Sequence, residues 1–340
     1  MKKWTALGFA IIAAVMLLLL PNTPKTQYYH NQGKIFGTYY NIRYEATEDC
    51  HDSVMAALKA VDQSLSMFNL NSVISKINRN DSVILDSLFI TMFNEAQAIS
   101  QLSNGAFDIT VAPLVNAWGF GKNIALGDEA KKLLGKKAQI DSIKTFVGYD
   151  KVHLVNHCLQ KDDKRITLDA SAIAKGYACD IVANTLREKG CENLLVDIGG
   201  EVVLQGVNDK GQAWKVGISK PNNNGEGMDN TLQEVIASTN LCMATSGNYL
   251  QYYMVGSERR SHTIDPRTGY PVEHSLLSAT VSASSCMRAD ALATACMVLG
   301  EKEALNMIEC TPDAACYLII AQADSLRIST SSRWKVDQPR

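Results

Sequence analysis

The sequence has almost no net charge, because 33 Lys and Arg residues face 35 Asp and Glu residues, for a net charge of −2 over 340 residues. A chain without excess basic charge gives no support for nucleic-acid binding. Its nine cysteines contain no C-x-x-C pair, so zinc and thioredoxin-like sites lack their usual spacing. We also find no internal repeat and no low-complexity tract. The composition, 46% hydrophobic and 20% charged, is that of a globular protein of one or two domains.

The first 20 residues differ in kind from the rest. Lys2 and Lys3 precede an uncharged run from Trp4 to Leu20, which is the pattern of a signal sequence or a short membrane span. No small-x-small cleavage site and no lipid-accepting cysteine follow the run, which favours an uncleaved anchor over a cleaved signal peptide. In both cases the basic end stays inside and the rest is exported. We therefore expect an anchor or signal over 1–20, a polar linker over 21–32 and one domain over 33–332.

The centre of the chain is the stretch 166–200. Apolar residues at three- and four-residue steps predict a helix over Ala172–Lys189, capped by Asp169-Ala170-Ser171. A buried strand, Leu194–Ile198, and the turn Gly199-Gly200 follow. The start of such a helix suits an anion, because free backbone N–H groups point outward there. The alternative is an ordinary capped core helix.

Strands and helices alternate along the chain without a regular βαβ rhythm. The sequence therefore predicts an α+β fold with largely antiparallel or mixed sheets and packed helices. Gly37 inside the predicted strand Lys34–Tyr44 indicates a bulge or the close approach of another group, and Val152–Val155 is expected to pair with Arg165–Leu168. Helices are expected over Asp49–Leu65, Leu85–Leu102, Asp128–Lys137, Met287–Leu299 and Glu301–Glu309.

Asp290 and Thr294 lie four residues apart in a predicted helix, so both side chains project from one face. A carboxylate and a hydroxyl suit a hard cation such as Mg²⁺, which prefers oxygen ligands. A backbone carbonyl from the loop Asp169–Ala172 could complete the protein's share of the shell. The alternative is that Asp290 complements the helix dipole and that Thr294 bonds back to its own helix.

Two more residues are candidates for chemistry. His262 ends a strand just before the turn Asp265–Gly269, where it could accept a proton from an attacking hydroxyl or stabilise the turn. Lys175 lies in the first turn of the central helix, where its ammonium could reach a phosphate or simply be solvated. The polar segment Thr245–Asn248 could give N–H groups to a phosphate or only turn the chain.

Eight segments occur together in one order, and the set is far more specific than any member. With them the chain resembles the ApbE family of FAD:protein FMN transferases over roughly residues 30–330, which implies an ApbE-like (T-fold-like) architecture. The segments are Phe36–Thr38, Ser66–Phe68, Asn104–Thr110, Asp169–Ala178, Asp197–Glu201, Ala244–Tyr249, Ser261–Gly269 and Ala289–Ala295.

The resemblance also implies roles for individual residues. Mg²⁺ would be held by the Ala172 carbonyl, Asp290 and Thr294, and His262 would be the general base. Phe36 stands where the family often has Met, and Phe68 where it often has Tyr, but both keep an apolar surface for a flavin or adenine ring. The residues expected to contact the flavin nucleotide are Phe36, Phe68, Ala106, Phe107, Asp108, Asp169, Lys175 and Ile264.

The activity that the resemblance implies is Mg²⁺-dependent transfer of the FMN part of FAD to a Thr or Ser hydroxyl of a client flavoprotein, with release of AMP. Two alternatives remain: an FAD pyrophosphatase that gives FMN and AMP, and a non-catalytic exported FAD-binding protein. The family suggests an exported electron-transfer subunit as the client. With the N-terminal segment, this places the domain at the periplasmic face of a bacterial inner membrane.

Overall fold

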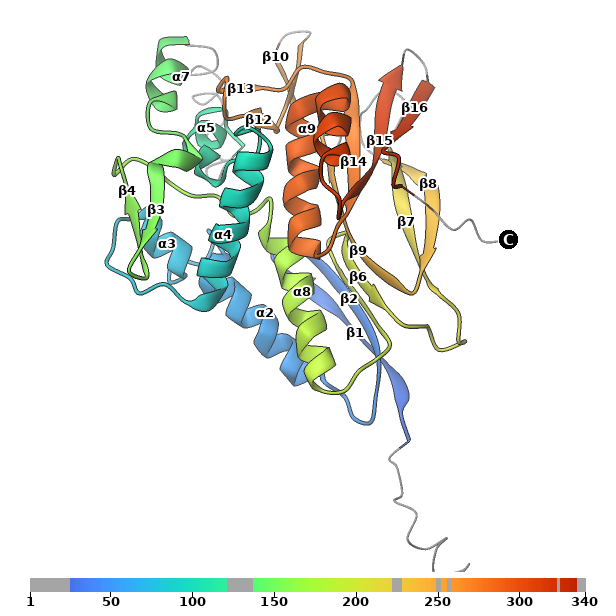
Figure 1. Ribbon diagram of the computed structural model, residues 1–340. Helices are drawn as coiled ribbons and strands as arrows, with labels where there is room; N and C mark the ends of the chain where they lie inside the picture. Colours follow the sequence, from blue (N-terminus) through green and yellow to red (C-terminus); the bar gives the residue numbers. More distant parts are fainter. Residues whose placement is uncertain are drawn as a thin grey trace, which may run out of the picture.

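An eight-stranded antiparallel sheet forms the centre of the molecule (Figure 1), in the order β1-β2-β5-β6-β9-β14-β15-β16. The computed structural model describes residues 25–120, 137–221, 228–248, 252–255, 258–322 and 325–334. The strands of this sheet are β1 (Gln27–Ile35), β2 (Thr38–Ala46), β5 (Leu194–Ile198), β6 (Glu201–Gln205), β9 (Asn240–Gly247), β14 (Leu276–Ser282), β15 (Ala315–Gln322) and β16 (Ser325–Thr330).

Helices cover one face of the sheet. Figure 1 shows α8 and α9 lying across it, and both pack directly on its strands. Their apolar stripes form the main core together with those of two further helices, and the buried side chains follow the 3.6-residue period of an amphipathic helix. These helices are α2 (His51–Leu65), α4 (Ser87–Leu102), α8 (Ala174–Glu188) and α9 (Cys286–Glu309).

The hairpin of β7 (Trp214–Pro221) and β8 (Met228–Ser238) supplies apolar side chains to the other face. On β6, Val202 and Leu204 pack with Trp214 of the hairpin, whereas Val203 belongs to the helix-side core. This alternation follows from the two-residue period of a strand. The sheet is therefore covered on both faces, as expected for a domain built in packed layers.

The remaining elements are short. Small hairpins are formed by β3 (Val152–Val155) with β4 (Cys158–Lys161), β10 (Tyr252–Val255) with β11 (Glu258–Ser261), and β12 (Ile264–Asp265) with β13 (Tyr270–Pro271). The short helices are α3 (Val73–Asn78), η1 (Ile109–Val111), α5 (Ala112–Ala117), α7 (Lys137–Lys144) and η2 (Tyr149–Lys151).

The fold class predicted from the sequence is confirmed, and so is the break in the C-terminal helical region. α9 consists of two helical parts that meet at a kink, where Gly300 has φ 74° and ψ 174°. Glycine reaches positive φ without a Cβ clash, so the chain changes direction there. The predicted helices Met287–Leu299 and Glu301–Glu309 correspond to the two parts of α9 on either side of this residue.

Two local predictions are wrong. Lys34–Tyr44 is not one strand with a bulge: it is the tip of the β1–β2 hairpin, because Phe36 and Gly37 both take positive φ (52° and 75°) and turn the chain between paired strands. β1 begins at Gln27 and so takes in part of the expected linker 21–32. Arg165–Leu168 is not the partner of β3. The chain turns at Asn156-His157, both at positive φ, and β3 pairs with the strand that follows, β4.

Two predictions lie wholly or mostly outside the described residues: the N-terminal segment 1–20 and the helix Asp128–Lys137, of which only Lys137 is described, at the start of α7. Within the described ranges, no helix is both long and apolar enough to cross a membrane. All nine cysteines are free thiols in the structure, and Cys179 and Cys296 are buried in the core as small apolar residues.

Candidate functional site

The first turn of α8 touches the first turns of α9 at Gly176. A Cβ placed on Gly176 would lie 2.3 Å from the Cys286 carbonyl oxygen and 2.8 Å from Cβ of Asp290. Only glycine therefore allows the two helices to approach this closely. The Gly176 amide donates to Asp290 Oδ2 at 3.0 Å, so the carboxylate of α9 is held at the start of α8.

A second carboxylate joins the same two helices in the opposite direction. Asp180 of α8 accepts from the Cys286 amide through Oδ1 (2.9 Å) and from the Met287 amide through Oδ2 (2.8 Å). These amides belong to the free N-terminal turn of α9, which needs acceptors. Each helix thus gives a carboxylate to the backbone of the other.

The start of α8 differs from the prediction. The helix begins at Ala174 rather than Ala172, and its N-cap residue, Ile173, makes no side-chain cap. Asp169 instead bonds to the amide of Ser171 (2.8 Å), which favours a separate tight turn before the helix. In a helix beginning at Ala172, the Gly176 amide would bond to the Ala172 carbonyl. Here that amide bonds to Asp290, and the predicted ligand loop stays outside the helix.

Asp290 is buried, with 2% of its surface exposed. Burial raises the pKa of its carboxyl group, while the Lys175 ammonium and the Gly176 amide act to lower it. One helical turn further on, Thr294 Oγ1 lies 3.2 Å from Ser246 Oγ of β9. The carboxylate and the hydroxyl therefore come from one face of α9, as their spacing predicts.

Lys175 pairs with Glu201, the first residue of β6. The ammonium donates to Glu201 Oε1, and the Glu201 side chain is 2% exposed whereas that of Lys175 is 31% exposed. Burial raises the pKa of Glu201 to about 8, against the effect of Lys175. For Lys175, burial alone would lower the pKa, but the charges of Asp290 and Glu201 outweigh it and raise the pKa.

These groups fit a divalent cation. Two buried acids, Asp290 and Glu201, interact with one ammonium, and burial raises the pKa of both, so an added cation would favour their charged forms. Asp290, Thr294 and the loop carbonyl of Ala172 supply only hard oxygen donors, the kind that Mg²⁺ prefers. The described residues hold no group of three His, Cys, Asp or Glu that could bind a metal ion. A magnesium site of the predicted composition would depend on backbone and hydroxyl oxygens beside the Asp290 carboxylate.

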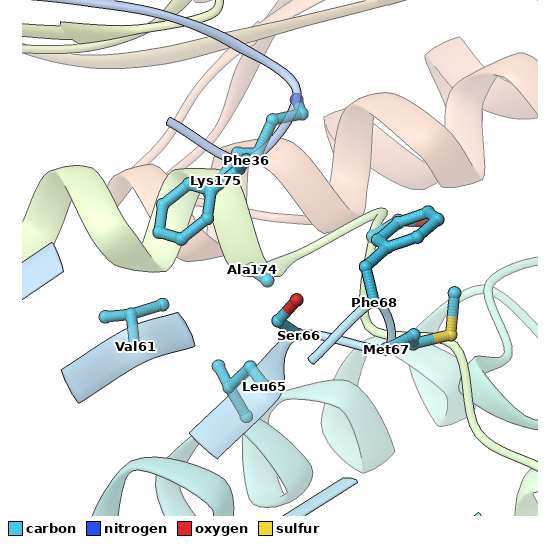
Figure 2. A pocket seen from close by; sticks show the side chains of 9 residues that line it. Phe36, Val61, Leu65, Ser66, Met67, Phe68, Ala174 and Lys175 are labelled. Atoms are coloured by element: carbon cyan, nitrogen blue, oxygen red, sulfur yellow. The ribbon is translucent and has the colours of Figure 1, made fainter. Parts of the chain in front are cut away.

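A pocket of about 120 Å³, open to solvent, lies beside this cluster. Figure 2 shows Phe36 and Lys175 on one side, Phe68 on the other, and Ala174 with Ser66 between them. The Phe68 side chain is largely exposed at the rim. The pocket is thus mainly apolar and aromatic, and Lys175 contributes to its wall. Its lining comes from the β1–β2 turn, α2, the loop after α2 and the start of α8, as Phe36, Val61, Leu65, Ser66, Met67, Phe68, Ser171, Ala174 and Lys175.

The segment from Ala106 to Thr110 is buried. Asp108 Oδ1 accepts from both the amide and the hydroxyl of Thr110, each at 2.7 Å, and thereby caps η1. Ala106 and Phe107 are almost fully buried. The Ile109 carbonyl accepts from the Asp169 amide at 2.6 Å, which ties this segment to the loop before α8. Two segments that the resemblance assigns to nucleotide binding are therefore adjacent.

Asp108 makes the stability of the fold depend on pH. Burial raises its pKa to about 6 despite the Thr110 hydrogen bonds, so the folded chain retains a proton that the unfolded chain releases above about pH 4. Stability should fall as pH rises from about 4 to about 6, by on the order of 3 kcal/mol from this group. Asp108→Asn keeps an acceptor for the Thr110 amide and should remove this contribution. Urea unfolding of both proteins at pH 4.5 and pH 7 checks it, and equal pH dependence in the two would refute the assignment.

His262 follows β11, just before the turn between β12 and β13, as predicted. Its ring packs edge-on to Phe120, with centroids 6.3 Å apart. Ile264 is buried in a cluster with Leu114 and Trp118. Trp118 Nε1 donates to the Gly269 carbonyl at 2.7 Å, so the loop after α5 anchors the turn that follows the histidine.

The structure thus gathers the candidates into two groups. The first unites Asp290, Lys175 and the pocket residues Phe36 and Phe68 around the start of α8, with Thr294 one turn further along α9. The second places His262 and Ile264 near Trp118 and Phe120. A shared role in flavin transfer requires His262 and the metal ligands to converge on one cleft, and this convergence stays a prediction.

Sequence reasoning missed two partners. Glu201 ends the segment Asp197–Glu201, which was noted only as part of the resemblance, and nothing in that segment indicates that the acid reaches Lys175. Ser246 lies in the polar segment Thr245–Asn248, for which we expected N–H groups for a phosphate or a simple turn. Its hydroxyl instead meets Thr294. The sequence shows that Ser246 is a short polar residue, but it does not show that the strand holding it lies beside Thr294.

Replacing Gly176 by alanine is expected to destabilise the fold by about 3 kcal/mol, because the new methyl group would overlap the Cys286 carbonyl and force α8 away from α9. Gly190→Ala is the matched control at the other end of α8. Gly190 has φ +82° and open space around it, so its replacement should cost only about 1 kcal/mol of backbone strain. Chemical denaturation measures both variants. An equal, small loss would mean that the helices tolerate separation at Gly176.

Comparisons with known proteins show the family to which the chain belongs. The family model described as the ApbE family matches residues 36–318, so the chain belongs to the ApbE family. The chain is similar to a Haemophilus influenzae protein named FAD:protein FMN transferase, at 35% identity with 96% of each chain covered. Among solved structures it is similar to the flavin transferase ApbE of Vibrio cholerae, with a TM-score of 0.80 and 32% identity over 91% of this chain and 98% of that one. The ApbE protein of Thermotoga maritima gives a TM-score of 0.77 at 27% identity, covering 90% and 97% of the two chains.

Proposed function

We propose that this protein is an FAD:protein FMN transferase that requires Mg²⁺. The observation that carries the proposal is the cluster of Asp290, Lys175 and Glu201 at the start of α8, beside a pocket with aromatic walls. An apolar pocket with a few convergent polar groups is the usual form of a nucleotide or cofactor site. The names of the curated relatives support the same activity.

The chain's own residues would act on FAD mainly through position and charge. Phe36 and Phe68 offer ring faces for a flavin or adenine. Lys175 places a positive charge in the pocket wall, where it would offset the charge of the diphosphate. Asp290, Thr294 and the Ala172 carbonyl would hold Mg²⁺. When bound, that ion neutralises charge on the phosphate oxygens while the phosphoanhydride breaks.

The reaction forms one bond and breaks one. A Thr or Ser hydroxyl oxygen of the client protein bonds to the phosphorus of the FMN part, and the bond from that phosphorus to the bridging oxygen breaks. AMP leaves with the bridging oxygen, and the hydroxyl proton passes to His262 as general base. The client then carries FMN through a phosphoester bond.

Incubating the purified protein with FAD, MgCl₂ and a flavoprotein acceptor tests the proposal. Covalent flavin on the acceptor, seen by fluorescence after denaturing electrophoresis and by mass spectrometry, is the expected result. Release of FMN and AMP without an acceptor would favour the pyrophosphatase instead. Tight FAD binding that ignores Mg²⁺ and the Asp290→Ala change, with no product, would indicate the exported FAD-binding protein.

We further propose that the domain works outside the cytoplasm, at the periplasmic face of a bacterial inner membrane. The support is the pair Lys2 and Lys3 before the uncharged run to Leu20. An exported electron-transfer subunit would then be the client. Protease treatment of spheroplasts checks the location: the full-length chain should be digested from outside, and protection of the chain would refute export.

Replacing Phe68 by alanine should raise the KM for FAD about fivefold with little change in kcat, because one aromatic contact with a bound ring is worth about 1 kcal/mol. Phe68 is 75% exposed, so stability should change by less than about 0.5 kcal/mol. Leu70→Ala is the matched control, because Leu70 is 69% exposed on the same loop and does not line the pocket. Steady-state kinetics with FAD varied separates the two, and an equal effect of both changes would contradict a direct contact.

A further inference from the structure

Glu201 is a buried acid whose two carboxyl oxygens differ in their hydrogen bonding. Its side chain is 2% exposed, and Oε1 accepts from the Lys175 ammonium. Oε2 is buried without a hydrogen-bond partner in the described part of the chain. Gly199-Gly200, both at positive φ, turn the chain from β5 into β6 and place Glu201 at its first position.

Such an arrangement is a poor source of stability. A buried ion pair repays the loss of hydration only when the remaining lone pairs are also satisfied, and one oxygen of Glu201 is not. The cysteine below it, Cys179, donates to the Glu201 backbone carbonyl at 3.1 Å rather than to its carboxylate. The acid therefore has one evident side-chain task, which is to hold the ammonium of Lys175.

Lys175 is the member of the pair that reaches the pocket. It belongs to the pocket lining, whereas Glu201 does not, and 31% of its side chain is exposed. A lysine side chain has four rotatable bonds, so an unpaired Lys175 could take many positions in this open volume. The hydrogen bond to Glu201 favours the side-chain position in which the ammonium lies at the start of β6.

We propose that Glu201 is a positioning residue for flavin transfer, which fixes the Lys175 ammonium where the FAD diphosphate reacts. This inference rests on the proposed function. Glu201 lies behind the pocket wall and acts through Lys175 without touching FAD. The charge of Lys175 attracts FAD in any position, but stabilisation of the reacting phosphate requires the correct one.

The test compares kinetics of Glu201→Gln, Lys175→Met and the double variant with the full-length protein. In Glu201→Gln, kcat should fall about 10- to 100-fold, the effect of displacing a catalytic group by about 1 Å, while the KM for FAD changes less than about threefold. Lys175→Met should raise the KM and lower kcat together. Adding Glu201→Gln to Lys175→Met should change kcat by less than about twofold, because the residue through which Glu201 acts is gone.

The control is Asp197→Asn in the same segment. Asp197 accepts from the Gly200 amide and has no bond to Lys175, so this change should leave the ratio of kcat to KM near that of the wild type. Thermal unfolding of each variant gives a readout besides activity: the double variant should be at least as stable as Glu201→Gln, in which the Lys175 ammonium has lost its hydrogen-bonded carboxylate.

Wild-type kcat in Glu201→Gln would overturn the proposal, as would full additivity of the two changes. A rise in the half-saturating Mg²⁺ concentration as large as that of Asp290→Asn would also overturn it, because Glu201 would then be a metal ligand. Absence of transfer by the wild-type protein would refute the proposed function instead. In that event, the unfolding measurements still report whether Glu201 and Lys175 are coupled.

Discussion

Replacing Asp290 by asparagine is expected to lower the rate of flavin transfer about 1,000-fold at fixed, moderate Mg²⁺. The carboxylate is the only charged group in the predicted ligand set, and a metal that offsets phosphate charge supplies several kcal/mol of transition-state stabilisation. Asparagine keeps the shape and the acceptor for the Gly176 amide, so the contact between α8 and α9 should survive. Transfer assays across a range of MgCl₂, with calorimetric Mg²⁺ titration, measure the effect.

The dependence of transfer activity on Mg²⁺ concentration distinguishes a metal ligand from a purely structural role for Asp290. If Asp290 is a ligand, activity should recover partly at high Mg²⁺, and Mg²⁺ should stabilise the wild-type protein against heat more than the variant. The control is Asp180→Asn, which alters the other carboxylate between the same helices. It should lower stability without changing the Mg²⁺ requirement. Equal Mg²⁺ affinity in Asp290→Asn and the wild type would remove Asp290 from the metal site.

Replacing His262 by alanine should lower kcat for transfer about 1,000-fold, the usual loss when a general base is removed, while FAD binding stays within about threefold of the wild type. The ring lies after β11, where its packing on Phe120 orients it. An unprotonated imidazole is needed, so wild-type kcat should rise with pH through the histidine pKa, and the variant should lose this dependence. Single-turnover transfer and FAD fluorescence titration give the two quantities.

Phe120→Leu serves as the comparison for His262. It removes the edge-on ring contact but leaves the imidazole in place, so it should reduce kcat far less than His262→Ala. Partial rescue of His262→Ala by added imidazole would support the role of a base. A His262→Ala variant that transfers flavin at the wild-type rate, or that has lost FAD binding, would show that His262 is not the general base and has a structural role at the turn.

The sequence was informative where periodicity and local chemistry decide the structure. The stripes of α2, α4 and α9, the strands β5 and β6, and the pairing of Asp290 with Thr294 on one helix face all follow from spacing. The order of eight short segments led to the family, which the model match over residues 36–318 confirms. These features need only residues that lie close in the chain.

The errors have a common physical origin. Positive φ is uncommon for a residue other than glycine, so the sequence does not predict a turn at Phe36-Gly37. The turn forms because the flanking strands β1 and β2 pair along their whole length. α8 begins later than predicted because the Gly176 amide donates to Asp290, which is 114 residues away in the chain. Glu201 was missed as the partner of Lys175 for the same reason, because the sheet brings them together. Contacts between distant segments decide such positions, and no local pattern encodes them.

The reciprocal carboxylate bonds between α8 and α9 have a consequence for ligand affinity. Asp180 holds the amides of Cys286 and Met287, and Asp290 holds that of Gly176, so neither helix slides or rotates alone. The entropy of bringing the two helices into register is lost during folding. A cation or dinucleotide that arrives later meets a preorganised wall, and more of its contact energy remains for tight association.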